Sequence, residues 1–148
     1  MNFVRTLHSA NETAALAEQL GRSLSGREVV ALNGPLGAGK TLFVQGLARG
    51  LGCPADEPVV SPTFVLMREY QGRLRLVHFD WYRISDVAEL RDLGWDELLA
   101  EPATVIAVEW AERFPALLPE TVIRVHLEHE SLADRTCRVE NWPAPSPR

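Results

Sequence analysis

Residues 34–41 read Gly-Pro-Leu-Gly-Ala-Gly-Lys-Thr and constrain the fold of this 148-residue chain more than any other segment. The pattern G-x-x-x-x-G-K-[ST] is typical of the phosphate-binding loop (P-loop) of nucleotide hydrolases and kinases. Its glycines let backbone N–H groups converge on phosphates, Lys40 reaches phosphate oxygens, and the Thr41 hydroxyl holds Mg²⁺. Lys40 is the one lysine among 15 Lys and Arg residues, and the planar fork of arginine would not replace its compact ammonium. The sequence therefore predicts a nucleotide site.

The segments on either side of the loop support this interpretation. Residues 28–32 form a short, β-branched apolar run that is typical of a buried strand. Downstream, apolar residues recur at helical spacing from Leu42 to Leu51, and Gly50 and Gly52 supply stop signals. A P-loop needs this order of strand, loop and helix, because the helix N-terminus contributes part of the field that binds phosphate.

The composition indicates one globular domain. At 148 residues and 46% hydrophobic content, the chain is long enough for a core of ordinary size. No apolar run approaches the length of a membrane span, and the first residues lack the hydrophobic region of a signal peptide. Cys53 and Cys137 make neither a metal-ligand spacing nor a disulfide framework, so we expect free thiols in a reducing compartment. A cytoplasmic location is the resulting expectation.

The net charge of −5 bears on the choice of partners. Proteins that bind nucleic acids use clustered Lys and Arg to displace counterions from phosphate. Here the arginines are dispersed, and the nearest approaches to a cluster are Arg73 with Arg75 and Arg135 with Arg138. If the chain acts on a nucleic acid, we expect another subunit to hold that nucleic acid.

Strand and helix patterns alternate along the chain. Ser9 followed by Glu12 forms a capping box that starts a helix, and residues 53–62 are rich in Pro and acidic residues, which predicts a loop. Further strands are predicted at 3–7, 64–70, 74–79, 104–108, 121–127 and 135–140, with a hairpin between the second and third of these, and short helices at 86–93 and 95–99. We predict an α/β fold, a single P-loop NTPase domain over residues 1–141 with a mixed, mostly parallel central sheet flanked by helices. Residues 142–148 contain three prolines and are expected to be disordered.

Two carboxylates are candidates for the chemistry. Hydrolysis needs a carboxylate near Mg²⁺ and the attacking water. Glu109 directly follows the buried run 104–108, as in a Walker-B strand, although the same position suits the first solvated residue after a strand. Asp80 ends the strand that begins at 74, where a carboxylate can bind the metal through water or orient the nucleophile. The sequence leaves open which of the two is the direct metal ligand.

Three residues near Asp80 belong to the same motif. Strand alternation places His78 and Asp80 on one face, so His78 could be a partner of the site or a buried structural histidine. Arg83 could reach phosphate or form a surface ion pair. Tyr82 is expected in core or hinge packing.

The loop after the P-loop helix ends in Ser61, Pro62 and Thr63. A hydroxyl pair fixed by proline at this position resembles a switch segment whose threonine senses the γ-phosphate and Mg²⁺. Without the P-loop, the same residues would indicate an ordinary turn.

Taken together, the GPLGAGKT loop, the SPTF segment 61–64, the HFDWYR segment 78–83 and a buried strand that ends in Glu109 and Trp110 resemble the bacterial TsaE (YjeE) ATPases. The resemblance extends over nearly the whole chain. It implies an ATPase required for making threonylcarbamoyladenosine in tRNA. It also implies action with a threonylcarbamoyl transferase subunit and its inactive paralogue, with tRNA contacted only through that complex.

The resemblance assigns roles to individual residues. ATP and Mg²⁺ would be the cofactors, and Glu109 and Asp80 the catalytic residues. The implied nucleotide-binding residues are Gly37, Ala38, Gly39, Lys40, Thr41, Leu42 and Thr13, the implied metal ligands are Thr41, Glu109 and Asp80, and the implied switch residues are Ser61, Pro62, Thr63, His78, Tyr82 and Arg83. Pro35 departs from the family, which commonly has Asp there, so any partner contact made by that Asp is in question.

Two other function classes share the P-loop. A small-molecule or nucleoside kinase would need an arginine-bearing lid, and the best candidate, residues 83–91, is short. A nucleotide-dependent interaction switch would bind nucleotide without useful catalysis. GTP is disfavoured because the chain has no Asn-Lys-x-Asp motif. With no evident arginine finger of its own, an ATPase of this kind is expected to be slow alone and stimulated by partners.

Overall fold

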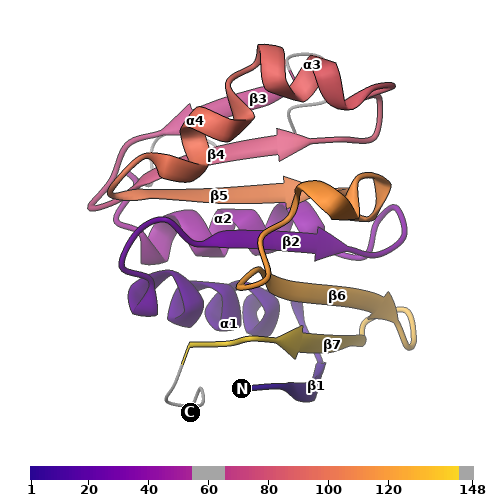
Figure 1. The fold of residues 1–148 in the computed structure, drawn as a ribbon. Coiled ribbons are helices and arrows are strands. Elements are labelled where there is room, and N and C mark those ends of the chain that lie inside the picture. The colour runs from indigo at the N-terminus through magenta and orange to yellow at the C-terminus, as the bar shows by residue number, and fades with distance from the viewer. Residues whose placement is uncertain (55–65, 144–148) are drawn as a thin grey trace.

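The computed structural model describes residues 1–54 and 66–143. In chain order the elements are β1 (Phe3–Leu7), α1 (Ala10–Ser23), β2 (Val29–Asn33), α2 (Lys40–Gly50), β3 (Met67–Tyr70), β4 (Arg75–Asp80), α3 (Val87–Asp92), α4 (Trp95–Ala100), β5 (Thr104–Glu109), the 3-10 helices η1 (Ala111–Arg113) and η2 (Pro115–Leu117), β6 (Ile123–His129) and β7 (Arg135–Glu140). The strands form one seven-stranded sheet with the order β1-β7-β6-β2-β5-β4-β3 (Figure 1). The predicted α/β class with a mixed, mostly parallel sheet is confirmed.

The four central strands run parallel and the outer strands run antiparallel. β6, β2, β5 and β4 pair in parallel, whereas β3 is antiparallel to β4, β7 to β6, and β1 to β7. The carboxyl ends of the parallel strands therefore meet at one edge of the sheet, on the right in Figure 1. In open α/β sheets this edge is where ligands bind, and the P-loop leaves β2 there.

The sheet is covered by helices on both faces. α1 and α2 pack side by side on one face, and α3 and α4 lie over β4 and β5 on the other (Figure 1). Two helical glycines allow the close approach of α2 to α1, because a Cβ atom at Gly46 or Gly50 would collide with α1 backbone carbonyls. Gly50 is the last residue of α2, so its role here is packing as well as helix termination.

Several predicted boundaries shift by a few residues. β3 begins at Met67, Leu66 before it has a positive φ of 64°, and residues 64 and 65 of the predicted strand lie outside the described residues. The predicted β3–β4 hairpin is confirmed by antiparallel pairing. Cys53 and Cys137 are both buried, and neither forms a disulfide among the described residues. Within the described residues, no helix is both long enough and apolar enough to cross a membrane.

Trp142, which falls within the segment predicted to be disordered, packs against the sheet. Trp142 is only 3% exposed, its ring packs edge-on against Phe3 at a centroid distance of 5.4 Å, and its backbone N–H donates to the Met1 carbonyl. A large aromatic side chain buries enough apolar area to hold this segment on the sheet despite the neighbouring prolines. Residues 144–148 lie outside the described residues.

Candidate functional site

The loop between β2 and α2 has the backbone of an anion site. Gly37 and Gly39 have positive φ values of 80° and 105°, which favour glycine, and Gly39 is the N-cap of α2. Because Gly39 has no side chain to cap α2, the first N–H groups of that helix remain available. A helix N-terminus of this kind attracts phosphate through its N–H groups and its dipole.

Lys40, the first residue of α2, is held in a fixed position. Its side chain is buried, its Nζ donates a hydrogen bond of 2.7 Å to the Gly34 carbonyl, and Nζ lies 3.8 Å from the centroid of the Trp110 ring. Burial lowers the pKa of Lys40, while the carboxylates of Glu109, Glu112 and Asp80 oppose that shift. The ammonium therefore sits where negative charge is concentrated and water is scarce.

The two candidate carboxylates lie side by side. Parallel pairing of β4 with β5 places Asp80 opposite Glu109, and both residues are buried, at 8% and 4% exposure. Asp80 accepts a 2.9 Å hydrogen bond from the Tyr82 backbone N–H through Oδ1. Glu109 Oε2 lies 2.7 Å from His78 Nε2, in a pair that is also buried. The sequence left open whether Glu109 is a site carboxylate or the first solvated residue after a strand. Its burial excludes the second interpretation.

These groups face one cavity, which we call the phosphate-side cavity. It has a volume of about 240 Å³, and its lining residues are Leu36, Gly37, Gly39, Lys40, Thr41, Leu42, Asp80, Glu109 and Trp110. The three predicted metal ligands thus share it, and they offer hydroxyl and carboxylate oxygens, the donors that Mg²⁺ prefers. Among the described residues no group of three His, Cys, Asp or Glu side chains could hold a metal. A Mg²⁺ ion that is bound mainly by phosphate and water needs only one or two protein carboxylates. Thr41, Asp80 and Glu109 therefore fit a Mg²⁺ ion bound in this way.

A second cavity lies on the α1 side of the P-loop, and we call it the base-side cavity. It has a volume of about 190 Å³, and its lining residues are Ser9, Ala10, Thr13, Gly37, Ala38, Gly39, Leu42, Ala133 and Arg135. Thr13, predicted from the family resemblance alone, lies in this wall. Gly37, Gly39 and Leu42 line both cavities, so one elongated ligand can span the two.

Sequence reasoning missed the residues that the β6–β7 turn contributes to the base-side cavity. Ala133 lies within this turn and Arg135 begins β7, and no local motif marks either residue. The Arg135 guanidinium donates to backbone carbonyls of the turn, including that of Asp134 at 3.1 Å. Asp134 also contacts His8 at 3.2 Å, which ties the turn to the start of α1.

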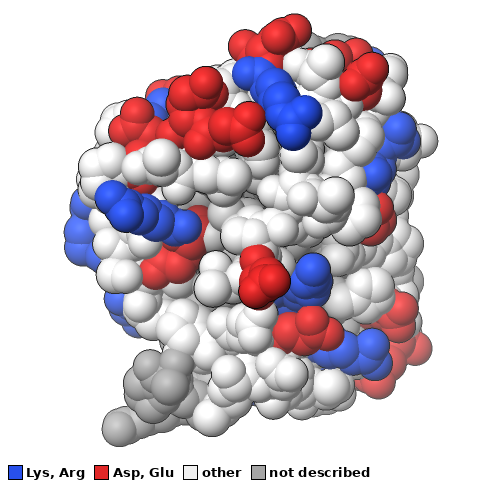
Figure 2. Space-filling view, in the orientation of Figure 1, with Lys and Arg blue, Asp and Glu red and all other residues white. Residues whose placement is uncertain are grey.

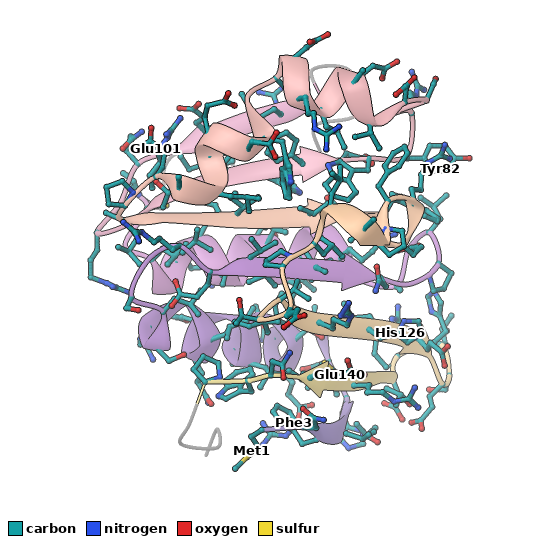
Figure 3. All side chains as sticks on the ribbon, viewed as in Figure 1. Met1, Phe3, Tyr82, Glu101, His126 and Glu140 are labelled. Atoms are coloured by element: carbon teal, nitrogen blue, oxygen red, sulfur yellow. The ribbon has the colours of Figure 1, made fainter. Side chains whose placement is uncertain are left out.

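Trp110 is the other residue that motif reasoning left without a role. It has a positive φ of 60°, which is strained for a bulky residue, and such strain is often found at functional sites. Its ring lies between Lys40 and Tyr82, whose ring centroid is 4.9 Å away. Tyr82 was expected in core or hinge packing, but it is 55% exposed and projects beyond the carboxyl end of β4 (Figure 3).

The remaining switch residues are placed only in part. Arg83 is exposed at the same end of the sheet, next to Tyr82. Ser61, Pro62 and Thr63 lie outside the described residues, so their predicted contact with the site stays a prediction.

Comparison with known proteins agrees with the motifs. The family model described as "Threonylcarbamoyl adenosine biosynthesis protein TsaE" matches residues 7–137. The tRNA threonylcarbamoyladenosine biosynthesis protein TsaE of Treponema pallidum is 43% identical over 119 residues, which cover 80% of this chain and 86% of that protein. The protein of the same name from Nostoc is 39% identical over 137 residues, covering 90% and 82%. The crystal structure of Bacillus subtilis YdiB superposes with a TM-score of 0.79 at 29% identity, covering 94% of this chain and 84% of that one.

Proposed function

The chain belongs to the TsaE family of tRNA threonylcarbamoyladenosine biosynthesis proteins, and from this premise we propose that it is a Mg²⁺-dependent ATPase. We further propose that it acts with the threonylcarbamoyl transferase subunit and its inactive paralogue, and that it reaches tRNA only through them. The observation that carries the proposal is the phosphate-side cavity, where Lys40, Thr41, Asp80 and Glu109 converge on one side of a helix N-terminus.

Each of these side chains would have a task in hydrolysis of the phosphoanhydride bond between the β- and γ-phosphates of ATP. The backbone N–H groups of residues 37–41 and the Lys40 ammonium would bind and orient the phosphates, and the Thr41 hydroxyl would ligate the metal. When bound, Mg²⁺ offsets the charge on the phosphate oxygens. Glu109 and Asp80 would hold the metal and the attacking water, since carboxylate oxygens coordinate Mg²⁺, directly or through its bound water, and accept hydrogen bonds from water.

The lining of the base-side cavity favours a nucleotide, rather than phosphate alone, as the ligand of the site. Its lining is made mostly of glycine and alanine with Leu42, and its polar side chains are those of Ser9, Thr13 and Arg135. A few polar groups in an otherwise apolar wall are typical of pockets that orient a planar ligand. We therefore assign the base and ribose to this side of the P-loop.

The surface charge supports the proposed indirect contact with tRNA. On the face shown in Figure 2, acidic side chains gather over α3 and α4, and the arginines lie scattered among them. Arg91, on α3, pairs with Asp96 on α4 at 3.4 Å. A face of mixed charge offers few free cations for phosphate, and phosphate contacts dominate the affinity for nucleic acids.

Reconstitution of the tRNA modification tests the proposal. Purified transferase pair, tRNA, threonylcarbamoyl donor and Mg-ATP are incubated with and without this chain under multiple-turnover conditions. We expect modification to require the chain, and ATP hydrolysis by the chain to be slow alone and faster with the pair. Glu109→Gln serves as the matched control that still binds nucleotide. Equal modification without the chain, or tight tRNA binding by the chain alone at physiological salt, would contradict the proposal, and a phosphorylated small-molecule product would indicate a kinase.

A further inference from the structure

His78 is a fully buried polar side chain at the back of the phosphate-side cavity. Its side chain is 0% exposed, and its Nε2 lies 2.7 Å from Oε2 of Glu109, which lines the cavity. Its neighbours along that face of the sheet, such as Leu76 and Ala107, are apolar core residues. A side chain that only filled this position would be apolar too, because burying an imidazole costs free energy unless it is hydrogen-bonded.

The second ring nitrogen of His78, Nδ1, also indicates that the imidazole serves Glu109. Nδ1 is buried and has no hydrogen-bond partner among the described residues. Because Nε2 faces a carboxylate, which only accepts, Nε2–H is the donor of the hydrogen bond between them. The one hydrogen bond that the imidazole makes within the described chain is therefore directed at Glu109.

That hydrogen bond bears on how Glu109 can act on Lys40. The carboxylate of Glu109 acts on Lys40 through space, and the Lys40 ammonium is hydrogen-bonded to the Gly34 carbonyl and lies over the Trp110 ring. A carboxylate free to turn toward Lys40 would compete with phosphate for the ammonium. With Oε2 held by His78, one of the two Glu109 oxygens is removed from that competition.

We propose that His78 is a positioning residue for Glu109: its Nε2–H fixes one carboxylate oxygen so that the other is presented to the phosphate-side cavity. This inference rests on the proposed function, in which Glu109 serves Mg²⁺ and the attacking water. Hydrogen-bond partners behind a metal-site ligand set its orientation, and losing one typically costs about 10–100-fold in metal affinity or activity.

Two amide variants separate positioning from packing. The amide nitrogen of Gln can take the place of histidine Nε2, whereas the shorter Asn reaches only as far as Nδ1. A non-hydrolysable ATP analogue is titrated by calorimetry into wild type, His78→Gln and His78→Asn, with Mg²⁺ and with EDTA. We expect wild type and His78→Gln to gain similarly from Mg²⁺, and His78→Asn to lose about tenfold or more of that gain. Affinity in EDTA should be equal in all three.

Turnover provides the second measurement. We expect kcat of His78→Asn to fall, its KM for Mg-ATP to rise in step with the affinity lost in calorimetry, and His78→Gln to stay near wild type in both. Thermal melts check folding, and His78→Leu, which has no side-chain donor, replaces His78→Asn if the latter does not fold. Equal behaviour of His78→Gln and of the variant without a donor at the Nε2 position, or no gain from Mg²⁺ in wild type, would overturn the inference. Absence of hydrolysis by wild type would instead refute the proposed ATPase, and the binding measurement would still decide the role of His78.

Discussion

Two histidine–carboxylate pairs lie at opposite ends of the proposed nucleotide site, and they differ in burial. His78 and Glu109, on the phosphate side, are 2.7 Å apart with side chains 0% and 5% exposed. His8 and Asp134, on the base side, are 3.2 Å apart with side chains 64% and 35% exposed. Breaking a buried pair leaves an unpaired polar group in the protein interior, whereas water replaces a broken exposed pair.

The difference follows from how each side is built. The phosphate side is formed by the carboxyl ends of β2, β4 and β5, and its charged groups are buried and fixed by neighbours. The base side is formed by the start of α1 and the β6–β7 turn, which surface contacts hold together. Catalysis requires reacting groups fixed within a fraction of an ångström, while recognition of a planar base tolerates a softer wall. The effects of substitutions should therefore differ between the two sides. On the phosphate side they should be large and act on hydrolysis and phosphate binding, and on the base side they should be smaller and act on nucleotide affinity.

The largest effect is expected for Glu109→Gln. The substitution keeps the shape of the side chain and removes the charge, so nucleotide binding should persist while hydrolysis falls by about 10²–10⁴-fold, the usual worth of a positioned acid or base. Phosphate release and nucleotide affinity are measured on the same preparation. Asp80→Asn should show the same separation with a smaller loss. Hydrolysis at the wild-type rate in Glu109→Gln would mean that Glu109 is only a strand-end residue.

Lys40→Ala comes next and should act on binding. Losing a charge-assisted contact to phosphate costs about 1.5–3 kcal/mol, which corresponds to roughly tenfold or more in affinity for ATP. Lys40 and the N-terminal amine of Met1 are the two primary amines of the chain, so an amine-reactive label offers a second measurement. Mg-ATP should protect Lys40 and leave Met1 reactive. Equal labelling of Lys40 with and without saturating nucleotide is incompatible with the P-loop assignment.

The phosphate side was predictable from the sequence because its residues follow local patterns. The P-loop is a contiguous motif, and Glu109 and Asp80 both end apolar strands whose parallel pairing brings them together. A role for His78 as a partner of the site was one of two interpretations that the sequence left open, and its pairing with Glu109 was not predicted, since alternation along a strand gives the face but not the contact. The role of Trp110 was not predictable, because its positive φ and its position over Lys40 arise from the turn after β5.

The base side and the exact limits of the fold were less predictable. Ala133 and Arg135 lie in the same cavity as Thr13 because β7 pairs with β1, where Arg135 is opposite Leu7. This pairing joins the two ends of the described chain, and local sequence does not reveal it. Local composition also predicted a tail from residue 142, but packing of Trp142 on Phe3 extends the ordered chain. In each case a tertiary contact outweighed the local signal.

Ala133→Trp should sharpen the comparison by blocking only the base side. An indole in the cavity of about 190 Å³ would occupy the space assigned to the base, and we expect roughly tenfold weaker ATP binding, about 1.4 kcal/mol. Affinity for inorganic triphosphate, which lacks base and ribose, should be unchanged. Ala133→Ser is the control for substitution in the turn itself. Equal weakening of ATP and triphosphate would show that the two cavities do not act separately.

The smallest effect is expected for His8→Ala, the exposed counterpart of the His78 variants. Exposed pairs of this kind contribute about 0–1 kcal/mol, because water solvates both partners when the pair is broken. The free energy of unfolding, measured by denaturant titration, should change by no more than that, and kcat should stay at the wild-type value. ATP affinity should fall by a few-fold at most, since the Arg135 guanidinium still donates hydrogen bonds to backbone carbonyls of the β6–β7 turn, such as that of Asp134. A loss of turnover in His8→Ala as large as in His78→Asn would mean that the base side is as tightly coupled to the chemistry as the phosphate side, and the contrast between the two pairs would fail.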